Sequence, residues 1–173
     1  NSEPINKLEN EKIFNEKLEQ LEELNKKVVL CQLTDVTKFD SNGNQQWYKM
    51  LQDSAPSKGE IITQTSDGGY IIGGYDHFKG AALYKIDLEG TLEWDKYFFK
   101  QEGNSFFSGN ILDVIEDSDG NFISAGFKKD GNSGKLLYSF LLKTDDKGIE
   151  IFHTRIKDIT LNSLHITTNN EYV

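Results

Sequence analysis

The chain has 173 residues, of which 36% are hydrophobic and 12% aromatic, so it can bury the core of one domain, and a disordered protein is excluded. Its formal net charge of −9 would repel a phosphate backbone, and no basic stripe stands out beyond the pair Lys128 and Lys129, so nucleic acid is excluded as an expected partner. With 15 glycines and 2 prolines, the composition favours an all-β protein with many tight turns.

Residues 1–27 are predicted to form an amphipathic α-helix. This segment has no glycine, carries many Glu and Lys residues, and places its apolar residues three or four positions apart along one face. These residues are Phe14, Leu18, Leu21, Leu24 and, just beyond the segment, Val28. We expect the helix to pack against the rest of the chain or against a neighbouring domain. Self-association as a short coiled coil is the alternative.

The first residue of the chain is relevant to whether the protein is exported. The sequence begins at Asn1 rather than at methionine, which either a removed export signal or a trimmed start would explain. No run of 18 or more apolar residues occurs, so no transmembrane segment is predicted. Cys31 is the only cysteine, which rules out an intrachain disulfide, and we expect it to behave as a small buried apolar side chain.

Residues 28–173 contain a repeated unit of about 50 residues with two hairpins in each copy. The second half of the unit occurs three times: Lys38-Phe39-Asp40 with Gly43 and Trp47, Lys85-Ile86-Asp87 with Gly90 and Trp94, and Lys143-Thr144-Asp145 with Gly148 and Phe152. The first half is a polar turn before an aromatic residue: Ser66-Asp67-Gly68-Gly69-Tyr70, Ser118-Asp119-Gly120-Asn121-Phe122, and Thr168-Asn169-Asn170-Glu171-Tyr172. Repeats of this length with two hairpins are typical of β-propellers.

We therefore predict an all-β fold, a partial β-propeller of four-stranded antiparallel blades that follows the N-terminal helix. Its parts are a half blade at 28–51, full blades at 59–99 and 110–156, and a half blade at 161–173. Closed propellers have about four to eight blades, so two full and two half blades are not expected to close. We expect the chain to be a fragment, or to complete its ring with further chain or with a partner.

The motif from Gln64 to Gly74, joined to Lys85-Ile86-Asp87, Gly90 and Trp94, resembles propeller-type repeats of secreted and surface-attached bacterial proteins, often Bacteroidetes-like. The resemblance covers residues 33 to 173. It implies a bacterial lipoprotein or other exported protein, located in the periplasm or at the cell surface. The spacing of Asp40, Gly43 and Trp47 is also similar to the tryptophan-docking motif of quinoprotein propellers. The motifs of quinoprotein propellers usually have one more residue between the Asp and the Gly, so no quinone or other cofactor is expected.

The residues that recur in the repeat have structural explanations. We expect the aromatic residues Trp47, Trp94 and Phe152 to fill the wedge between adjacent twisted sheets. The turns are expected to be built by Gly43, Gly90, Gly148, Asp67, Gly68, Asp119 and Gly120. The pair Asn42 and Gly43 predicts a primed turn, in which both residues have positive φ. The run from Asp117 to Asn121 lacks the glycine and glutamate positions of a calcium loop, so no metal site is predicted.

No catalytic motif stands out, since the three histidines have no metalloprotease spacing and no nucleophile elbow or phosphate-binding loop occurs. We therefore expect a non-enzymatic binding or scaffold module, whose longer loops recognise a protein or a glycan. The candidate binding residues are Asp76, His77, Phe78, Phe106, Phe107, Lys128, Lys129 and Asp130. Phe106 or Phe107 could instead cover the next strand. The alternative function is a hydrolase or quinoprotein-like enzyme whose site lies partly in blades missing from this chain. A third is a purely structural scaffold that docks through its helix.

Overall fold

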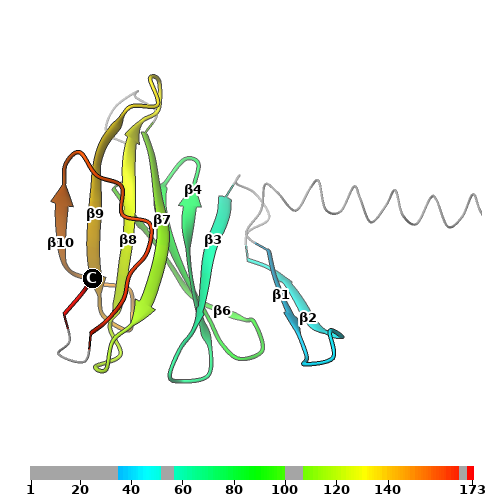
Figure 1. Ribbon diagram of the computed structural model, residues 1–173. Helices are drawn as coiled ribbons and strands as arrows, with labels where there is room; N and C mark the ends of the chain where they lie inside the picture. Colours follow the sequence, from blue (N-terminus) through cyan, green and yellow to red (C-terminus); the bar gives the residue numbers. More distant parts are fainter. Residues whose placement is uncertain (1–34, 52–56, 100–106, 168–170) are drawn as a thin grey trace, which may run out of the picture. The chain divides into compact units, whose positions relative to one another are not determined.

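The computed structural model describes residues 35–51, 57–99, 107–167 and 171–173, which form ten strands and no helix (Figure 1). The strands are β1 (Asp35–Phe39), β2 (Gln45–Met50), β3 (Ser57–Gln64), β4 (Tyr70–Asp76), β5 (Gly80–Ile86), β6 (Leu92–Phe98), β7 (Phe107–Glu116), β8 (Phe122–Asp130), β9 (Leu136–Thr144) and β10 (Glu150–Ile156). The all-β class is confirmed for this part of the chain. The helix predicted over residues 1–27 lies outside the described residues.

The strands form three separate antiparallel sheets in the order of the chain. The N-terminal sheet is β1-β2, the middle sheet is β3-β4-β5-β6, and the C-terminal sheet is β7-β8-β9-β10. Consecutive strands pair because short turns make neighbours in sequence into neighbours in space. The repeated lysine lies opposite the repeated aromatic residue in each sheet: Lys38 opposite Trp47, Lys85 opposite Trp94, and Lys143 opposite Phe152. The repeated unit therefore has the same register three times.

The predicted partial β-propeller is wrong. The described strands form three small sheets, none of which is closed. The turns and alternating side chains of a repeat determine how neighbouring strands pair, but they do not determine how whole sheets are arranged about an axis. The described part of the expected second half blade at 161–173 holds one isolated bridge, between Ile166 and Tyr172, and no named strand.

The core consists of two apolar layers on the two faces of the middle sheet. β5 is buried along its whole length because both of its faces are covered. Ala81 and Leu83 belong to a cluster shared with the C-terminal sheet, which contributes Phe122 and Phe140. The alternate residues Ala82, Tyr84 and Ile86 pack with Val36 and Trp47 of the N-terminal sheet. The two-residue period of the strand thus divides β5 between two interfaces.

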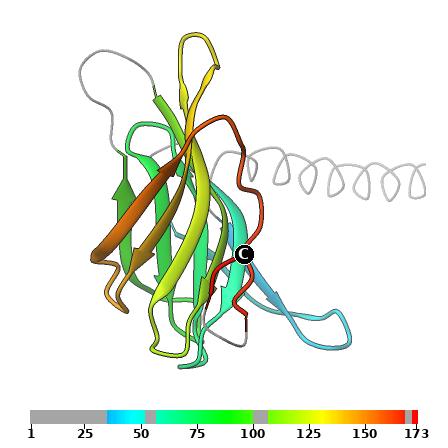
Figure 2. The ribbon, with the colours of Figure 1, turned by 60° about the vertical axis from the view of Figure 1, so that its left-hand side comes forward.

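The segment after β10 runs along the outer face of the C-terminal sheet (Figures 1 and 2). It is held by hydrogen bonds from the Ser139 hydroxyl to the Ile159 carbonyl, at 2.6 Å, and from the Leu164 backbone N–H to an Asp113 carboxylate oxygen, at 2.7 Å. Ile123 on β8 is fully buried. This segment therefore covers apolar surface that would otherwise face solvent.

The turn from Asp40 to Asn44 is a three-residue loop rather than the primed turn predicted from Asn42 and Gly43. Only Gly43 has a positive φ, of 83°, and its N–H donates to the Asp40 carbonyl at 3.1 Å. The Asp40 carboxylate accepts the backbone N–H groups of Asn42 and Asn44, both at 2.9 Å. The signal is therefore Asp-x-x-Gly, with the glycine in the left-handed region. Asp87, Asp117 and Asp145 begin turns of the same kind.

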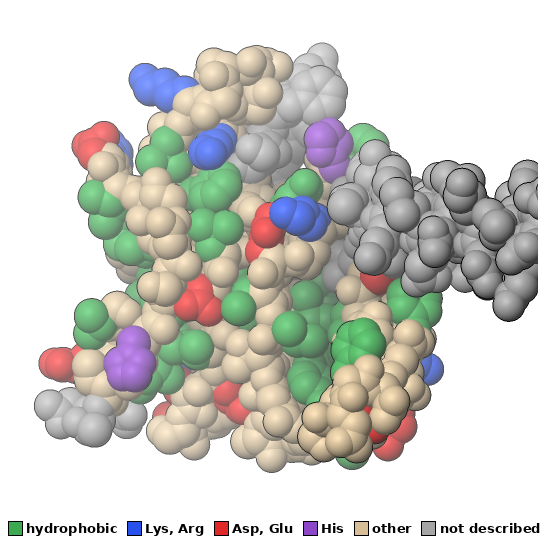
Figure 3. Space-filling model, turned by 45° about the vertical axis from the view of Figure 1, so that its right-hand side comes forward, with side chains coloured by type: hydrophobic (Ala, Val, Ile, Leu, Met, Phe, Trp, Pro, Cys, Tyr) green, Lys and Arg blue, Asp and Glu red, His purple; other side chains and the backbone are tan. Residues whose placement is uncertain are grey.

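The surface is mixed in charge. Lys and Arg side chains are scattered singly among acidic and apolar ones on the face that Figure 3 displays. Within the described residues, no helix has the length and apolarity needed to cross a membrane.

Candidate functional site

The three lysines that precede the Asp-x-x-Gly turns form the first part of the site. In the middle sheet, the buried Lys85 ammonium lies 2.8 Å from an Asp67 carboxylate oxygen and 3.0 Å from one of Glu93. Hydrogen bonding to Lys85, with a further bond from the Thr65 hydroxyl, lowers the pKa of Asp67 to about 2. Burial lowers the pKa of Lys85, but the two carboxylates outweigh it and the net shift is upward. Lys85 is therefore a charged, fully paired structural group.

Lys143 has the same role in the C-terminal sheet, with a carboxylate from a different turn position. Its ammonium lies 2.7 Å from an Asp117 oxygen and 3.1 Å from the Tyr172 hydroxyl. The hydrogen bond to Asp117 is the main reason why the pKa of Lys143 is raised. Asp119, which the sequence repeat aligns with Asp67, donates its backbone N–H to Asp117 and makes no ion pair within the described residues. In both sheets one carboxylate, that of Asp67 or Asp117, comes from the turn between the first two strands.

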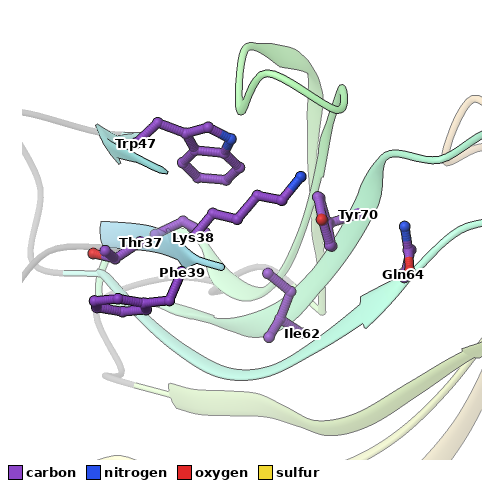
Figure 4. A pocket seen from close by; sticks show the side chains of 8 residues that line it. Thr37, Lys38, Phe39, Trp47, Ile62, Gln64 and Tyr70 are labelled. Carbon is purple, nitrogen blue, oxygen red and sulfur yellow. The ribbon is translucent and has the colours of Figure 1, made fainter. Parts of the chain in front are cut away.

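Lys38 of the N-terminal sheet is the exception. Among the described residues no carboxylate lies within 4.0 Å of its ammonium, and its one recorded contact is with the Tyr70 ring, 5.9 Å from the ring centre. The lysine extends across a groove toward Tyr70, with Trp47 on one side and Ile62 on the other (Figure 4). A cation at this distance from an aromatic face is only weakly held. Within the described residues its donors therefore have no stronger acceptor.

The groove around Lys38 has a volume of about 270 Å³ and joins the N-terminal sheet to the β3–β4 hairpin. Its lining consists of Val36, Thr37, Lys38, Phe39, Trp47, Ile62, Gln64 and Tyr70. Trp47 and Tyr70 form the aromatic part, with ring centres 6.3 Å apart and an edge-on geometry. Phe39 and Ile62 are 58% and 47% exposed, so apolar side chains border the opening. We call this region the Lys38 groove.

The repeated tryptophans Trp47 and Trp94 each lie against a glycine in a turn of the next sheet. A Cβ on Gly90 would come within 3.0 Å of the Trp47 ring, and one on Gly148 within 2.8 Å of the Trp94 ring. Trp94 also donates its indole N–H to the Asp146 carbonyl of the C-terminal sheet, at 3.1 Å. Phe152, at the equivalent position, is 38% exposed. Each tryptophan is therefore positioned by a turn of the next sheet.

The first group of predicted binding residues lies on the turn between β4 and β5. The buried Asp76 carboxylate accepts the backbone N–H groups of Phe78 and Lys79, at 2.9 and 2.8 Å, so its role is to shape the turn. His77 and Phe78 stack edge-on with ring centres 5.5 Å apart, and Phe78 is 61% exposed. This pair presents an aromatic surface to solvent.

The second group lies at the end of β8. Lys129 lies over the Phe127 ring at 4.4 Å, and the Asp130 carboxylate accepts backbone N–H groups of the following turn from Asn132 and Ser133. Lys128 is partly buried on the same strand. The structure places this turn and the β4–β5 turn at the same end of their sheets (Figure 1), but it records no contact between them.

Two predicted binding residues are not placed by the structure. Phe106 lies outside the described residues, and for Phe107 only the backbone, at the start of β7, is described. The aromatic platform predicted from His77, Phe78, Phe106 and Phe107 thus stays a prediction. The sequence reasoning missed Lys38, Phe39, Ile62 and Gln64. A signal for Lys38 was available in the repeat, because a lysine stands two residues before the Asp of three Asp-x-x-Gly turns: Lys38, Lys85 and Lys143.

Other chemistry is sparse in the part of the chain that the structure describes. No group of three or more His, Cys, Asp or Glu side chains there could hold a metal ion. His153 pairs with Glu150 at 2.7 Å, whereas the His77 ring stacks on Phe78, so these two imidazoles make separate local contacts. The Tyr97 hydroxyl donates to Asp95, and burial, together with that bond, raises its pKa. These groups form no recognisable catalytic arrangement.

No model of a known protein family matches the chain. A comparison with curated proteins also finds no match.

We expect the Asp67→Asn variant to be less stable than the natural chain at pH 6 but not at pH 2. The pKa of Asp67 is about 2 in the folded chain, below the ordinary value of 3.8. Its stabilising effect is therefore complete above about pH 4 and is lost as the pH falls through 2. Because Asp67 is 57% exposed, the loss should stay below about 1 kcal/mol.

Urea unfolding of both proteins at the two pH values measures this difference. The matched control is Asp119→Asn, because Asp119 makes no ion pair among the described residues and should behave like the natural chain at either pH. An equal loss of stability at pH 6 and pH 2 for Asp67→Asn would contradict the assignment of the Lys85–Asp67 pair.

Proposed function

We propose that the protein is a non-enzymatic binding module that takes a segment of a partner protein into the Lys38 groove. The observation that carries this proposal is the combination of an exposed apolar border, Phe39 and Ile62, with an ordered aromatic wall, Trp47 and Tyr70. Exposed apolar side chains grouped around a concave surface are typical of binding sites.

The strands beside the groove favour an extended polypeptide. β1 is paired only with β2, and β3 only with β4, in the described part of the chain. A strand with one unpaired edge offers backbone donors and acceptors to a polypeptide that adds to the sheet. The backbone would then provide affinity, and the groove would select alternate side chains of the partner.

A second candidate surface for the same function is the β4–β5 turn. The specific observation is that Phe78 is 61% exposed on a turn that the buried Asp76 holds in place. A rigid exposed aromatic residue suits a glycan ring or a protein partner. As part of the proposal, we place the module in an exported or surface-attached bacterial protein, on the basis of the resemblance of its repeats.

The test is selection of random 12-residue peptides, displayed on phage, by the full chain. We expect selected peptides to bind about tenfold more weakly to Phe39→Thr and to Ile62→Thr, because each change removes apolar contact area while keeping a β-forming residue. The matched control is Ile151→Thr, whose isoleucine is 53% exposed on β10, and binding to it should be unchanged.

The outcome also separates the two surfaces. Loss of binding in Phe78→Thr, with no change in the groove variants, would replace the Lys38 groove by the β4–β5 turn. If no selected peptide responds to any of these changes, the proposed function fails.

A further inference from the structure

We infer that the partner side chain entering the groove beside Lys38 is a carboxylate, so that the partner segment carries an Asp or Glu between apolar residues. This inference rests on the proposed function and specifies the chemistry of the same site. Three features of the structure support it: the equivalent positions of the repeated lysines, the geometry of the groove, and the hydrogen bonds and orientation of the nearby acidic residues.

The repeated lysines are equivalent in backbone position, so their differences are informative. Lys38, Lys85 and Lys143 each lie directly opposite the repeated aromatic residue of the next strand. Lys85 and Lys143 bind carboxylates at 2.8 and 2.7 Å, and in both cases the acid lies on a turn beside the lysine strand. The N-terminal sheet has no such turn among the described residues, because β1 and β2 are its only strands. A carboxylate from outside these residues would complete the arrangement.

The groove strengthens such a contact. The Lys38 ammonium extends between the Trp47 ring and Ile62 and faces Tyr70 (Figure 4). Apolar and aromatic walls lower the local dielectric, so a charge-assisted hydrogen bond there is stronger than one at an open surface. The exposed Phe39 and Ile62 border the same opening, and they would contact apolar residues on either side of the acid.

The acidic residues that neighbour Lys38 along the described chain, Asp40 and Asp35, are either hydrogen-bonded within their own turn or project from the opposite face of β1. The Asp40 carboxylate accepts two backbone N–H groups and the Asn44 side-chain amide of its own turn. Asp35 is three residues before Lys38 on the same strand, so it projects from the opposite face. The formal net charge of −9 repels acidic peptides in general. Selection of an acidic peptide therefore requires a local attraction, and Lys38 provides it.

The experiment uses the same peptide library with the full chain, Lys38→Gln and the control Lys147→Gln. Lys147 lies on an exposed turn, and its change removes the same charge outside the groove. We expect the natural chain and the control to select peptides with Asp or Glu at one fixed position beside apolar residues. Lys38→Gln should lose that preference.

A double-mutant cycle then tests the pairing directly. For one selected peptide, replacing its acid by the amide should weaken binding to the natural chain about tenfold or more, and Lys38→Gln should have a similar effect. The two changes together should weaken binding no further, because they remove the same contact.

The failures of the two proposals are distinguishable. Peptides that depend on Phe39 and Ile62 but carry no acid would overturn the inference and leave the binding function intact. Absence of any groove-dependent peptide would overturn both. Zero-length carbodiimide coupling of the peptide-free chain is the last check. A coupling from Lys38 to an acid of the same chain, or of a second copy, would overturn the inference, because the protein would then supply the carboxylate itself.

Discussion

The Phe140→Ala variant is expected to unfold with a free energy about 3 to 5 kcal/mol lower than that of the natural chain. Phe140 is fully buried between the middle and C-terminal sheets, and its ring centre lies 4.3 Å from that of Phe99. Truncation removes the apolar contact area and leaves a cavity between two sheets whose backbones are fixed by their own hydrogen bonds. Urea unfolding followed by circular dichroism measures the change.

The control for this prediction is the same substitution at an exposed site. Phe78 is 61% exposed, so Phe78→Ala should change the free energy of unfolding by less than about 0.5 kcal/mol. Similar losses for both variants would show that the two four-stranded sheets do not share one packed core.

We expect Gly126→Ala to lower the free energy of unfolding by on the order of 3 kcal/mol, although it adds only one methyl group. A Cβ at this position would lie 2.0 Å from the backbone carbonyl oxygen of Asn110 and 2.7 Å from the Phe140 ring. An irregularity in the pairing of β7 with β8, between Ile111 and Asp113, accompanies this close approach. A backbone oxygen in a sheet cannot move aside as a side chain can, so the strands must separate.

The neighbouring position in the equivalent strand provides the control. A Cβ on Gly73 of β4 would meet side-chain atoms of Ile111 and Ile61, at 2.5 and 3.0 Å, and no backbone atom is among its nearest neighbours. The equivalent residue in β8 is Ala125, which is fully buried. Gly73→Ala should therefore cost clearly less than Gly126→Ala in the same urea titration. The reverse order would contradict the close backbone contact.

The all-β class could be predicted from the sequence because it depends on local chemistry. The Asp-x-x-Gly turns and the alternating residues between them act within one hairpin. The type of turn was mispredicted, since the Asp40 carboxylate, by binding the N–H groups that follow it, stabilises a loop in which only Gly43 needs a positive φ. Local signals did not determine how the sheets are arranged, and the propeller prediction failed for that reason.

The Lys38 groove could not be predicted because it combines residues of β1, β2, β3 and β4 that are distant in sequence. The repeat aligned Lys38 with Lys85 and Lys143, but it could not show which of them has a carboxylate neighbour. It also aligned Asp67 with Asp119. In the structure, however, the lysine of the middle sheet pairs with Asp67, and the lysine of the C-terminal sheet pairs with Asp117. Ion pairs depend on side-chain reach across strands, which residue spacing alone does not encode. The loop residues His77 and Phe78 were identified as exposed candidates because they differ between repeats.

The most direct test of the proposed binding function is an NMR titration of the isotope-labelled full chain with one selected peptide. We expect the largest changes in chemical shift at the Trp47 indole N–H and at the amides of Lys38, Phe39, Ile62 and Tyr70, which line the Lys38 groove. Signals of His77, Phe78 and the β8–β9 turn should not change. Changes confined to those turns, or spread evenly over the chain, would contradict the assignment of the groove as the binding site.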